Sequence, residues 1–115
     1  MCIGNVTAKI ISVTEGGMAT ARFTNPTTSS FDVGFASYQA KSAVFELPQV
    51  LFDHHDQSLP PGITDITIAV PNCYYQLDAY CGKVIENLIP DNLYGPRLVA
   101  DAINAGSQTC SIFTR

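Results

Sequence analysis

The segment Pro71-Asn-Cys-Tyr-Tyr-Gln-Leu-Asp-Ala-Tyr-Cys-Gly82 decides the fold, because it combines a turn, an alternating run and a glycine stop. Successive side chains of an extended chain point to opposite faces. The alternation therefore sorts eight residues into two sets: Tyr75, Leu77, Ala79 and Cys81 on one face, and Tyr74, Gln76, Asp78 and Tyr80 on the other. This pattern predicts a half-buried antiparallel strand, central in its sheet, with Leu77 in the core.

The four cysteines constrain how this strand is held. Cys73 and Cys81 are separated by roughly 25 Å of extended chain, whereas a disulfide needs Cα atoms within about 7 Å, so they cannot pair with each other. Cys2 and Cys110 lie near the termini, and no Cys-x-x-Cys or zinc-finger histidine spacing is present. We predict disulfides in which each strand cysteine reaches a terminal one, which implies an oxidising compartment. Pairing within one molecule, pairing between molecules, and four buried free thiols all remain open.

Most of the remaining chain also follows a β pattern. Strands are predicted at residues 5–13, 18–25, 31–38, 49–54 and 63–70, with weaker candidates at 98–102 and 109–114. Gly, Pro and Asn turns separate them, and neither an amphipathic helix nor an internal repeat is visible. Short strands at this spacing predict an all-β chain forming one domain over residues 1–115, an immunoglobulin-like two-sheet β-sandwich of seven to eight strands.

One long loop, at about 82–97, interrupts this rhythm. Loops of this length without clear periodicity are uncommon in compact domains and are often functional or packed by their own side chains. Its apolar residues, Val84, Ile85, Leu88, Ile89 and Leu93, favour a packed flap over a ligand-binding loop.

Two groups of side chains are candidates for roles near this loop. Asp78 and Arg97 are predicted to form an ion pair that pins the loop over the strand, with binding of a polar ligand as the alternative. Tyr38, Tyr74 and Tyr80 are assigned to outer faces, where they form a candidate ligand face for sugar rings. The same tyrosines fit cross-strand packing or a protein interface.

The segment Asp53-His-His-Asp56 places two carboxylates beside both histidines of the chain. Its four side chains, Asp53, His54, His55 and Asp56, are plausible ligands for a divalent metal. On a strand, however, at most two of the four share a face, so a solvated strand edge is the favoured interpretation and no metal or other cofactor is predicted. No nucleophile elbow, phosphate loop or cysteine–histidine arrangement is present, so no catalytic residues are assigned and we expect no enzyme.

The charge pattern limits the partners. Only 14% of residues are charged, the net charge is −4, and the six Lys and Arg residues are never clustered. A nucleic-acid surface needs a basic patch, and a membrane span needs about 20 apolar residues; we expect neither partner. A sparse surface charge suits a secreted or assembled protein whose faces neighbours cover.

Several short motifs occur in a recognisable order: Gly34-Phe-Ala-Ser-Tyr38, Leu51-Phe-Asp53, Pro61-Gly62, Val70-Pro-Asn-Cys-Tyr-Tyr-Gln-Leu-Asp78, Cys81-Gly82 and Tyr94-Gly-Pro-Arg-Leu98. Over roughly residues 5–103 the chain resembles an uncharacterised immunoglobulin-like sandwich repeat of large secreted and cell-surface proteins of bacteria and archaea. The resemblance implies an extracellular structural or adhesive role without catalytic residues. The chain departs from that setting in being one short unit with a cysteine near each end.

These observations predict an extracellular or cell-surface structural protein, with self-assembly into a filament as the leading mode. Strand pairing through segments 1–5 and 106–115 would join the subunits into a homo-oligomer or polymer, and Cys2 or Cys110 would lock one subunit to the next. The alternative is an adhesive or carbohydrate-binding module that recognises a surface glycan through the tyrosine face and the long loop.

Overall fold

Eight β-strands and two short 3-10 turns account for the regular structure in the computed structural model, which describes residues 2–114. The strands are β1 (Thr7–Val13), β2 (Met18–Asn25), β3 (Phe31–Gln39), β4 (Gln49–Leu59), β5 (Gly62–Ala69), β6 (Tyr75–Cys81), β7 (Asn87–Leu88) and β8 (Ile103–Ala105). The 3-10 turns are η1 (Gly95–Arg97) and η2 (Ser111–Phe113).

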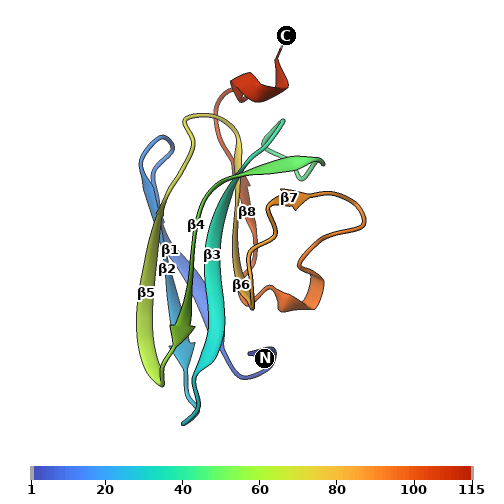
Figure 1. The fold of residues 1–115 in the computed structure, drawn as a ribbon. Helices are drawn as coiled ribbons and strands as arrows, with labels where there is room; N and C mark the ends of the chain where they lie inside the picture. Colours follow the sequence, from blue (N-terminus) through green and yellow to red (C-terminus); the bar gives the residue numbers. More distant parts are fainter. Residues whose placement is uncertain (1, 115) are drawn as a thin grey trace.

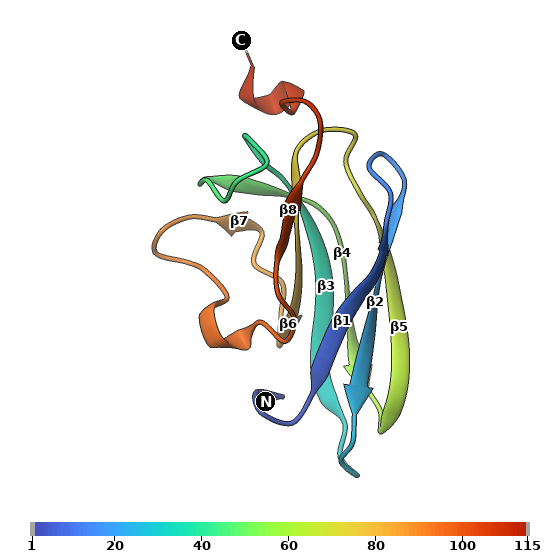
Figure 2. The ribbon, with the colours of Figure 1, turned by 180° about the vertical axis from the view of Figure 1, so that it is seen from behind.

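The strands form two antiparallel sheets that pack face to face (Figure 1). Sheet A has the order β1-β2-β5, and sheet B has the order β7-β4-β3-β6-β8. The segment that carries β7 and η1 extends from sheet B on the side away from sheet A, as the view from behind also shows (Figure 2). The prediction of an all-β sandwich with about eight strands is confirmed.

The main core lies between the two sheets, where alternate side chains of the strands meet. Phe23 of β2 and Ile68 of β5 pack in one cluster with Phe35 of β3 and Leu77 of β6, and each is at most 2% exposed. Burying an apolar side chain of this size stabilises the fold by roughly 1.5–3 kcal/mol. The assignment of Leu77 to the core is confirmed.

β6 differs from the predicted half-buried strand, because all seven of its residues are buried. Its position between β3 and β8 makes it an interior strand, as expected. Its outer face is covered by residues that follow β6 in the chain, and a second apolar cluster forms there with Tyr38, Tyr80 and Tyr94 among its members. Alternation identified the two faces but could not show that both are covered.

Three strand boundaries also differ from expectation. β4 continues past His54 to Leu59, because it pairs with β3 as far as Phe31. Of residues 98–102, only Leu98 forms a bridge, to Tyr80, and the strand β8 begins at Ile103. Residues 109–114 contain the 3-10 turn η2 and no strand. Cys110, directly before η2, is joined by a disulfide to Cys73, which lies two residues before β6 begins.

The disulfides join Cys2 to Cys81 and Cys73 to Cys110, with Cα–Cα distances of 5.5 and 4.9 Å. Each strand cysteine therefore reaches a terminal one, as predicted. Both bonds lie within one chain, and no cysteine is free, so the expected use of Cys2 or Cys110 to lock subunits together is wrong. Of the predicted inter-subunit segments, residues 1 and 115 lie outside the described part.

No helix within residues 2–114 is long and apolar enough to cross a bilayer.

Candidate functional site

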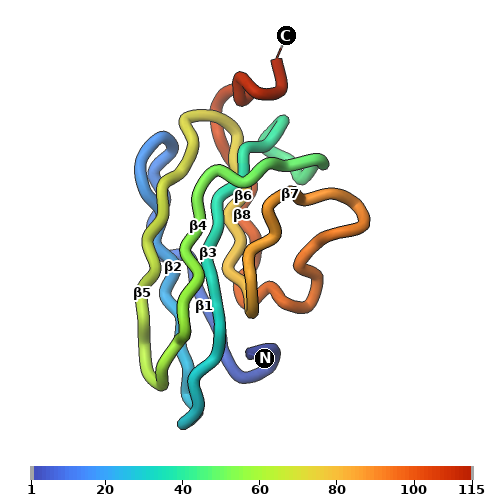
Figure 3. The backbone as a smooth tube through the Cα atoms, viewed as in Figure 1, coloured from blue at the N-terminus to red at the C-terminus, as the bar shows by residue number. Residues whose placement is uncertain are grey.

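The outer face of sheet B is roofed by residues 82–98, which we call the flap. The flap leaves β6 at Gly82, pairs with the start of β4 through β7, and returns through η1 to the bridge at Leu98 (Figure 3). Within the flap, Ile85 and Leu88 are buried, whereas Ile89 and Leu93 remain 41% exposed. The packed flap expected from the sequence is present.

Tyr94 anchors the flap to the sheet. Its ring stacks on Tyr80 with centroids 4.5 Å apart, and its hydroxyl lies 2.5 Å from that of Tyr38. The same hydroxyl accepts a hydrogen bond from the Ile85 N–H at 2.8 Å, while Tyr38 donates to the Ile85 carbonyl at 2.6 Å. Burial raises the pKa of Tyr94 to about 12, so the network is neutral at ordinary pH.

A second contact crosses β3 at a glycine. The Tyr80 hydroxyl donates to the Asp56 carboxylate at 2.5 Å, passing over Gly34, which pairs with both residues in the sheet. A Cβ atom at Gly34 would collide with the Tyr80 ring and the Asp56 carboxylate. Burial, followed by the hydrogen bond to Asp56, raises the pKa of Tyr80. Gly34 is thus required by the close approach of these two side chains.

The predicted tyrosine ligand face does not exist as an exposed surface. Tyr38 and Tyr80 are on the outer side of sheet B, as predicted, but both are fully buried because Tyr94 and the flap cover them. Tyr74 precedes β6 and is only partly buried, and its backbone pairs with Ala40 and Gln108. The rings of Tyr38 and Tyr80 are therefore not available to stack on a sugar.

The predicted ion pair between Asp78 and Arg97 is wrong as well. Arg97 Nε donates to the Cys81 carbonyl at 2.8 Å, its terminal amino group donates to the Lys83 carbonyl, and its guanidinium lies over the Tyr94 ring. Arg97 therefore does hold the flap, but through backbone carbonyls near Gly82. Asp78 lies three residues before Cys81 in β6, and its carboxylate accepts hydrogen bonds from the Gln76 side chain instead.

Beside Asp78, between the flap and β8, is a cavity of about 270 Å³. Most of the residues that line it are apolar. Its amide and carboxylate residues, Gln76, Asp78 and Asn104, are here called its polar base, and the remaining lining residues, its walls, are Phe45, Leu88, Leu93, Tyr94, Gly95, Leu98 and Ala102. We call this cavity the flap pocket. A concave apolar site with a few convergent polar groups is the usual form of a small-ligand site.

The base of the flap pocket contains polar atoms without partners. Gln76 Nε2 donates to both oxygens of Asp78, at 3.1 and 2.9 Å, which leaves Gln76 Oε1 without a hydrogen bond. Asn104, opposite Gln76 on β8, has an unpartnered Oδ1. Gln76 is 4% exposed and Asp78 1%. Burial raises the pKa of Asp78 to about 6, although the hydrogen bond from Gln76 acts to lower it.

Gln49 adds to this pattern on the same side of sheet B. It lies at the start of β4 opposite Leu88 of the flap, is fully buried, and has no hydrogen bond to either side-chain atom. Native proteins pair nearly all buried polar atoms, because an unsatisfied one costs roughly 1–3 kcal/mol. Within residues 2–114, the unsatisfied buried side-chain atoms thus belong to amides of sheet B, at or near the flap.

The cluster from Asp53 to Asp56 does not assemble a metal site. As expected from alternation, its side chains point to opposite faces: Asp53 accepts from the Ala69 N–H of β5 at 2.7 Å, whereas Asp56 accepts from Tyr80. His54 Nδ1 is 3.8 Å from Asp56 Oδ1. Residues 2–114 contain no group of three or more potential metal-binding side chains.

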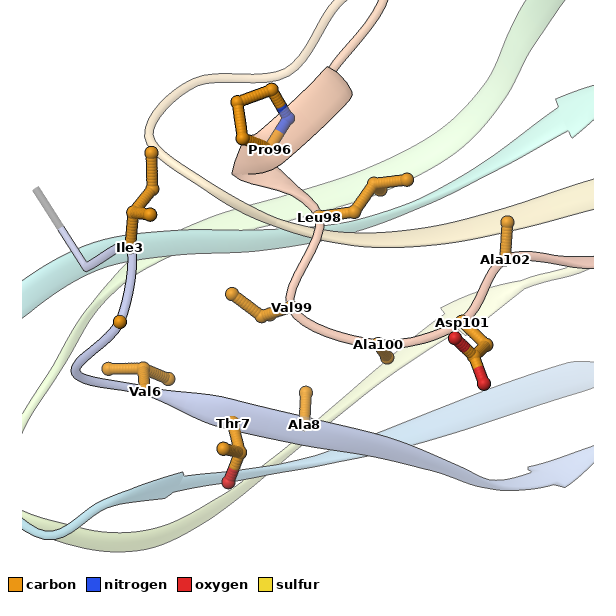
Figure 4. Close-up of a pocket in the computed structure, with 11 residues that line it drawn as sticks. Ile3, Val6, Thr7, Ala8, Pro96, Leu98, Val99, Ala100, Asp101 and Ala102 are labelled. Atoms are coloured by element: carbon orange, nitrogen blue, oxygen red, sulfur yellow. The ribbon is translucent and has the colours of Figure 1, made fainter.

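A wider depression of about 660 Å³ lies between the start of β1 and residues 96–102. Figure 4 shows Ile3, Val6 and Val99 directed toward the space between these segments. Asp101 is its one ionisable lining residue and is exposed. None of its lining side chains has an unpartnered buried polar atom, so it offers fewer specific contacts than the flap pocket.

The sequence pattern placed Gln76 and Asp78 together on one face but assigned neither Gln76 nor Asn104 to a site. The signal that could indicate this site is the combination of two amides and a carboxylate with a long apolar loop. The alternation pattern does not locate the short strand β8, so it gives Asn104 no position relative to Gln76.

Comparisons with known proteins give little to set beside this geometry. No family model and no curated protein matches the chain. Among solved structures, part of a beta-glucosidase from Kluyveromyces marxianus is similar, with 12% identity and a TM-score of 0.46. The match covers 89% of this chain and 14% of that one.

Proposed function

We propose that this protein is an extracellular, non-enzymatic binding module that holds a small group of its ligand in the flap pocket. The observation that carries the proposal is the polar base of the pocket, where Gln76 Oε1 and Asn104 Oδ1 lack partners beneath apolar walls. A ligand that donates hydrogen bonds would satisfy these atoms and recover the free energy lost by their burial.

Two further features support this role. The two disulfides suit an oxidising, extracellular setting. Asp78 and Tyr94 are the titratable side chains among the residues lining the pocket, which is a poor set for nucleophilic or acid–base catalysis. Binding therefore fits the pocket better than a reaction does.

The test is a protein-observed NMR screen with small alcohols, amides, amines and carboxylates. We expect a subset to shift the side-chain amide signals of Gln76 and Asn104. Ala102→Phe adds a ring at a lining residue of the pocket and leaves Gln76, Asp78 and Asn104 unmutated, so it should abolish those shifts. Thr28→Phe adds the same ring to an exposed loop and should preserve them. Shifts that survive Ala102→Phe, or a screen without any, would contradict the proposal.

A structural, self-associating role is the second candidate, and the edge of sheet A favours it. Among residues 2–114, β2 is the one strand that pairs with β5, and Ile63 near the start of β5 is 68% exposed. An uncovered strand edge of this kind can pair with a second copy. At its end, however, the N–H of Ala69 is occupied by Asp53 and the carbonyl by Ser37, which restricts pairing to the earlier residues.

Sedimentation velocity over a wide concentration range tests this second role. Association through β5 predicts concentration-dependent oligomers that Ile63→Lys disperses. Val44→Lys is the matched control, because Val44 is an apolar residue with the same 68% exposure and lies in the connection between β3 and β4 of sheet B. A monomer at all concentrations would eliminate the structural candidate.

A further inference from the structure

The hydrogen-bond capacity of the flap pocket is one-sided. A carboxylate can only accept, so the amide of Gln76 must turn its nitrogen toward Asp78, and its oxygen then faces away without a partner. Asn104 Oδ1 is unpartnered as well. The carboxylate itself keeps lone pairs beyond the two contacts from Gln76. The free hydrogen-bonding atoms of Gln76 and Asp78 are therefore acceptors, and Asn104 adds its Oδ1 to them.

The pocket also contains a negative charge without a counter-ion. Within residues 2–114, no lysine, arginine or histidine lines the pocket. Arg97 of the flap donates its hydrogen bonds to the carbonyls of Cys81 and Lys83. A buried carboxylate that lacks a cation is unfavourable, and the raised pKa of Asp78 reflects that burial. A positively charged ligand would complete the charge balance of this site.

The walls limit the size and nature of the rest of the ligand. Leu88, Leu93, Leu98 and Phe45 line the pocket above the polar base. At about 270 Å³, the cavity is smaller than the roughly 300–1,000 Å³ typical of sites for drug-sized molecules. A short unbranched apolar stem fits these walls better than a polar or bulky one.

We infer that the flap pocket binds a primary ammonium group on a short apolar stem. Asp78 is the counter-ion, and the side-chain oxygens of Gln76 and Asn104 accept the remaining N–H bonds. An ammonium has three donors and no acceptor, which matches the three groups at the base. This inference rests on the proposed binding function. The group can be a free alkylamine or the side chain of a lysine in a partner protein.

The test compares ligands that share a stem and differ in the head group. Calorimetric titration at pH 7.5 would use n-butylammonium, n-butanol and butyrate with the full chain. We expect butylammonium to bind at least ~10-fold more tightly than butanol, since charge-assisted hydrogen bonds are roughly twice as strong as neutral ones, and butyrate not to bind. Asp78→Asn should reduce the affinity for butylammonium to that for butanol. Asp65→Asn, the same change on the exposed face of sheet A, should leave it unaltered.

A pH series on the unmutated protein keeps the test valid if Asp78→Asn fails to fold. Protonation of Asp78 between pH 7 and 5 should weaken butylammonium binding and leave butanol binding unchanged. Equal binding of butanol and butylammonium would overturn the ammonium assignment while the binding module stands. Binding of no compound would overturn both.

Two additional ligands distinguish the source of the ammonium group. N-acetyl-lysine amide binding more tightly than butylammonium would indicate a lysine side chain of a partner protein. The reverse order would indicate a free amine. Tighter binding of N-acetyl-arginine amide than of either would overturn the assignment to a primary ammonium.

Discussion

The two outer faces of the sandwich carry polar side chains, yet their surroundings differ. On sheet A, Arg22 of β2 and Asp65 of β5 form a bidentate pair that stands in solvent. On sheet B, Gln76 and Asp78 occupy the equivalent outward positions of β6 but are buried beneath the flap. The difference is that the flap covers the outer face of sheet B, whereas the outer face of sheet A has no such cover among the described residues.

Outward-pointing polar side chains therefore affect the stability of the fold differently on the two sheets. A solvated ion pair contributes little, because water already satisfies both charges. A buried carboxylate and buried amides raise the free energy of the native state unless partners complete them. Ligand binding can therefore gain free energy on the covered face of sheet B. Substitutions on the open face of sheet A serve as controls.

The largest expected effect comes from removing the tyrosine that attaches the flap to sheet B. Tyr94→Ala takes away the ring that stacks on Tyr80 and the hydroxyl bonded to Ile85, so we expect a loss of about 4 kcal/mol in the free energy of unfolding. Urea denaturation at pH 7 measures it. Thr20→Ala on the open face should change the same quantity by less than about 0.5 kcal/mol. Similar losses for the two variants would mean that the flap contributes no more than a surface side chain.

Asp78 should make stability depend on pH in the acidic range. Its pKa is about 6 in the fold against an ordinary value of 3.8, so between these values the folded state holds a proton that the unfolded state has lost. The resulting stabilisation is present at pH 4 and is lost as the pH rises through 6, by about 3 kcal/mol at roughly 1.4 kcal/mol per pKa unit. Tyr38 and Tyr94, which also face this carboxyl, have raised pKa values and stay neutral throughout.

Denaturant midpoints from pH 4 to 7.5 for the unmutated chain and Asp78→Asn measure this contribution as a difference. The variant should lack that part of the pH dependence. Asp65→Asn provides the contrast, because the Arg22 guanidinium lowers the pKa of Asp65 and reverses the direction of its effect. Parallel profiles for the unmutated chain and Asp78→Asn would contradict the raised pKa.

A smaller effect is expected where Tyr80 crosses β3. Gly34→Ala places a methyl group against the Tyr80 ring and Asp56, and overpacking of this kind destabilises by about 2 kcal/mol. Tyr80→Phe removes the hydroxyl that reaches Asp56. In a double-mutant cycle, the two losses should sum to more than the loss in the combined variant, because both break the same contact. Strict additivity would show that Gly34 serves another purpose.

The smallest effect is expected for the ion pair of the open face. Arg22→Ala and Asp65→Ala should leave the unfolding midpoint nearly unchanged, and 1 M salt should remove any residual coupling. A coupling that persists in high salt would mean that this face is covered too, for example by a second copy of the chain.

Local patterns were sufficient for much of this architecture. Alternation located five of the six long strands nearly to the residue and identified the two faces of β6, because side-chain direction in a strand follows from the backbone itself. Extended-chain length excluded a bond between Cys73 and Cys81 and directed each toward a terminal cysteine. β4 was cut short at His54, since its last residues are polar and only pairing with β3 extends it.

The candidate site depended on contacts distant in sequence. The position of Asn104 opposite Gln76, the burial of Tyr38 and Tyr80, and the bonds of Arg97 to backbone carbonyls all follow from how residues 82–105 fold back over sheet B. The sequence alone determined which residues point outward, because that depends on neighbouring backbone bonds. Only the tertiary structure decided which outward face is shielded from solvent, because burial depends on the packing of segments that lie far apart in the sequence.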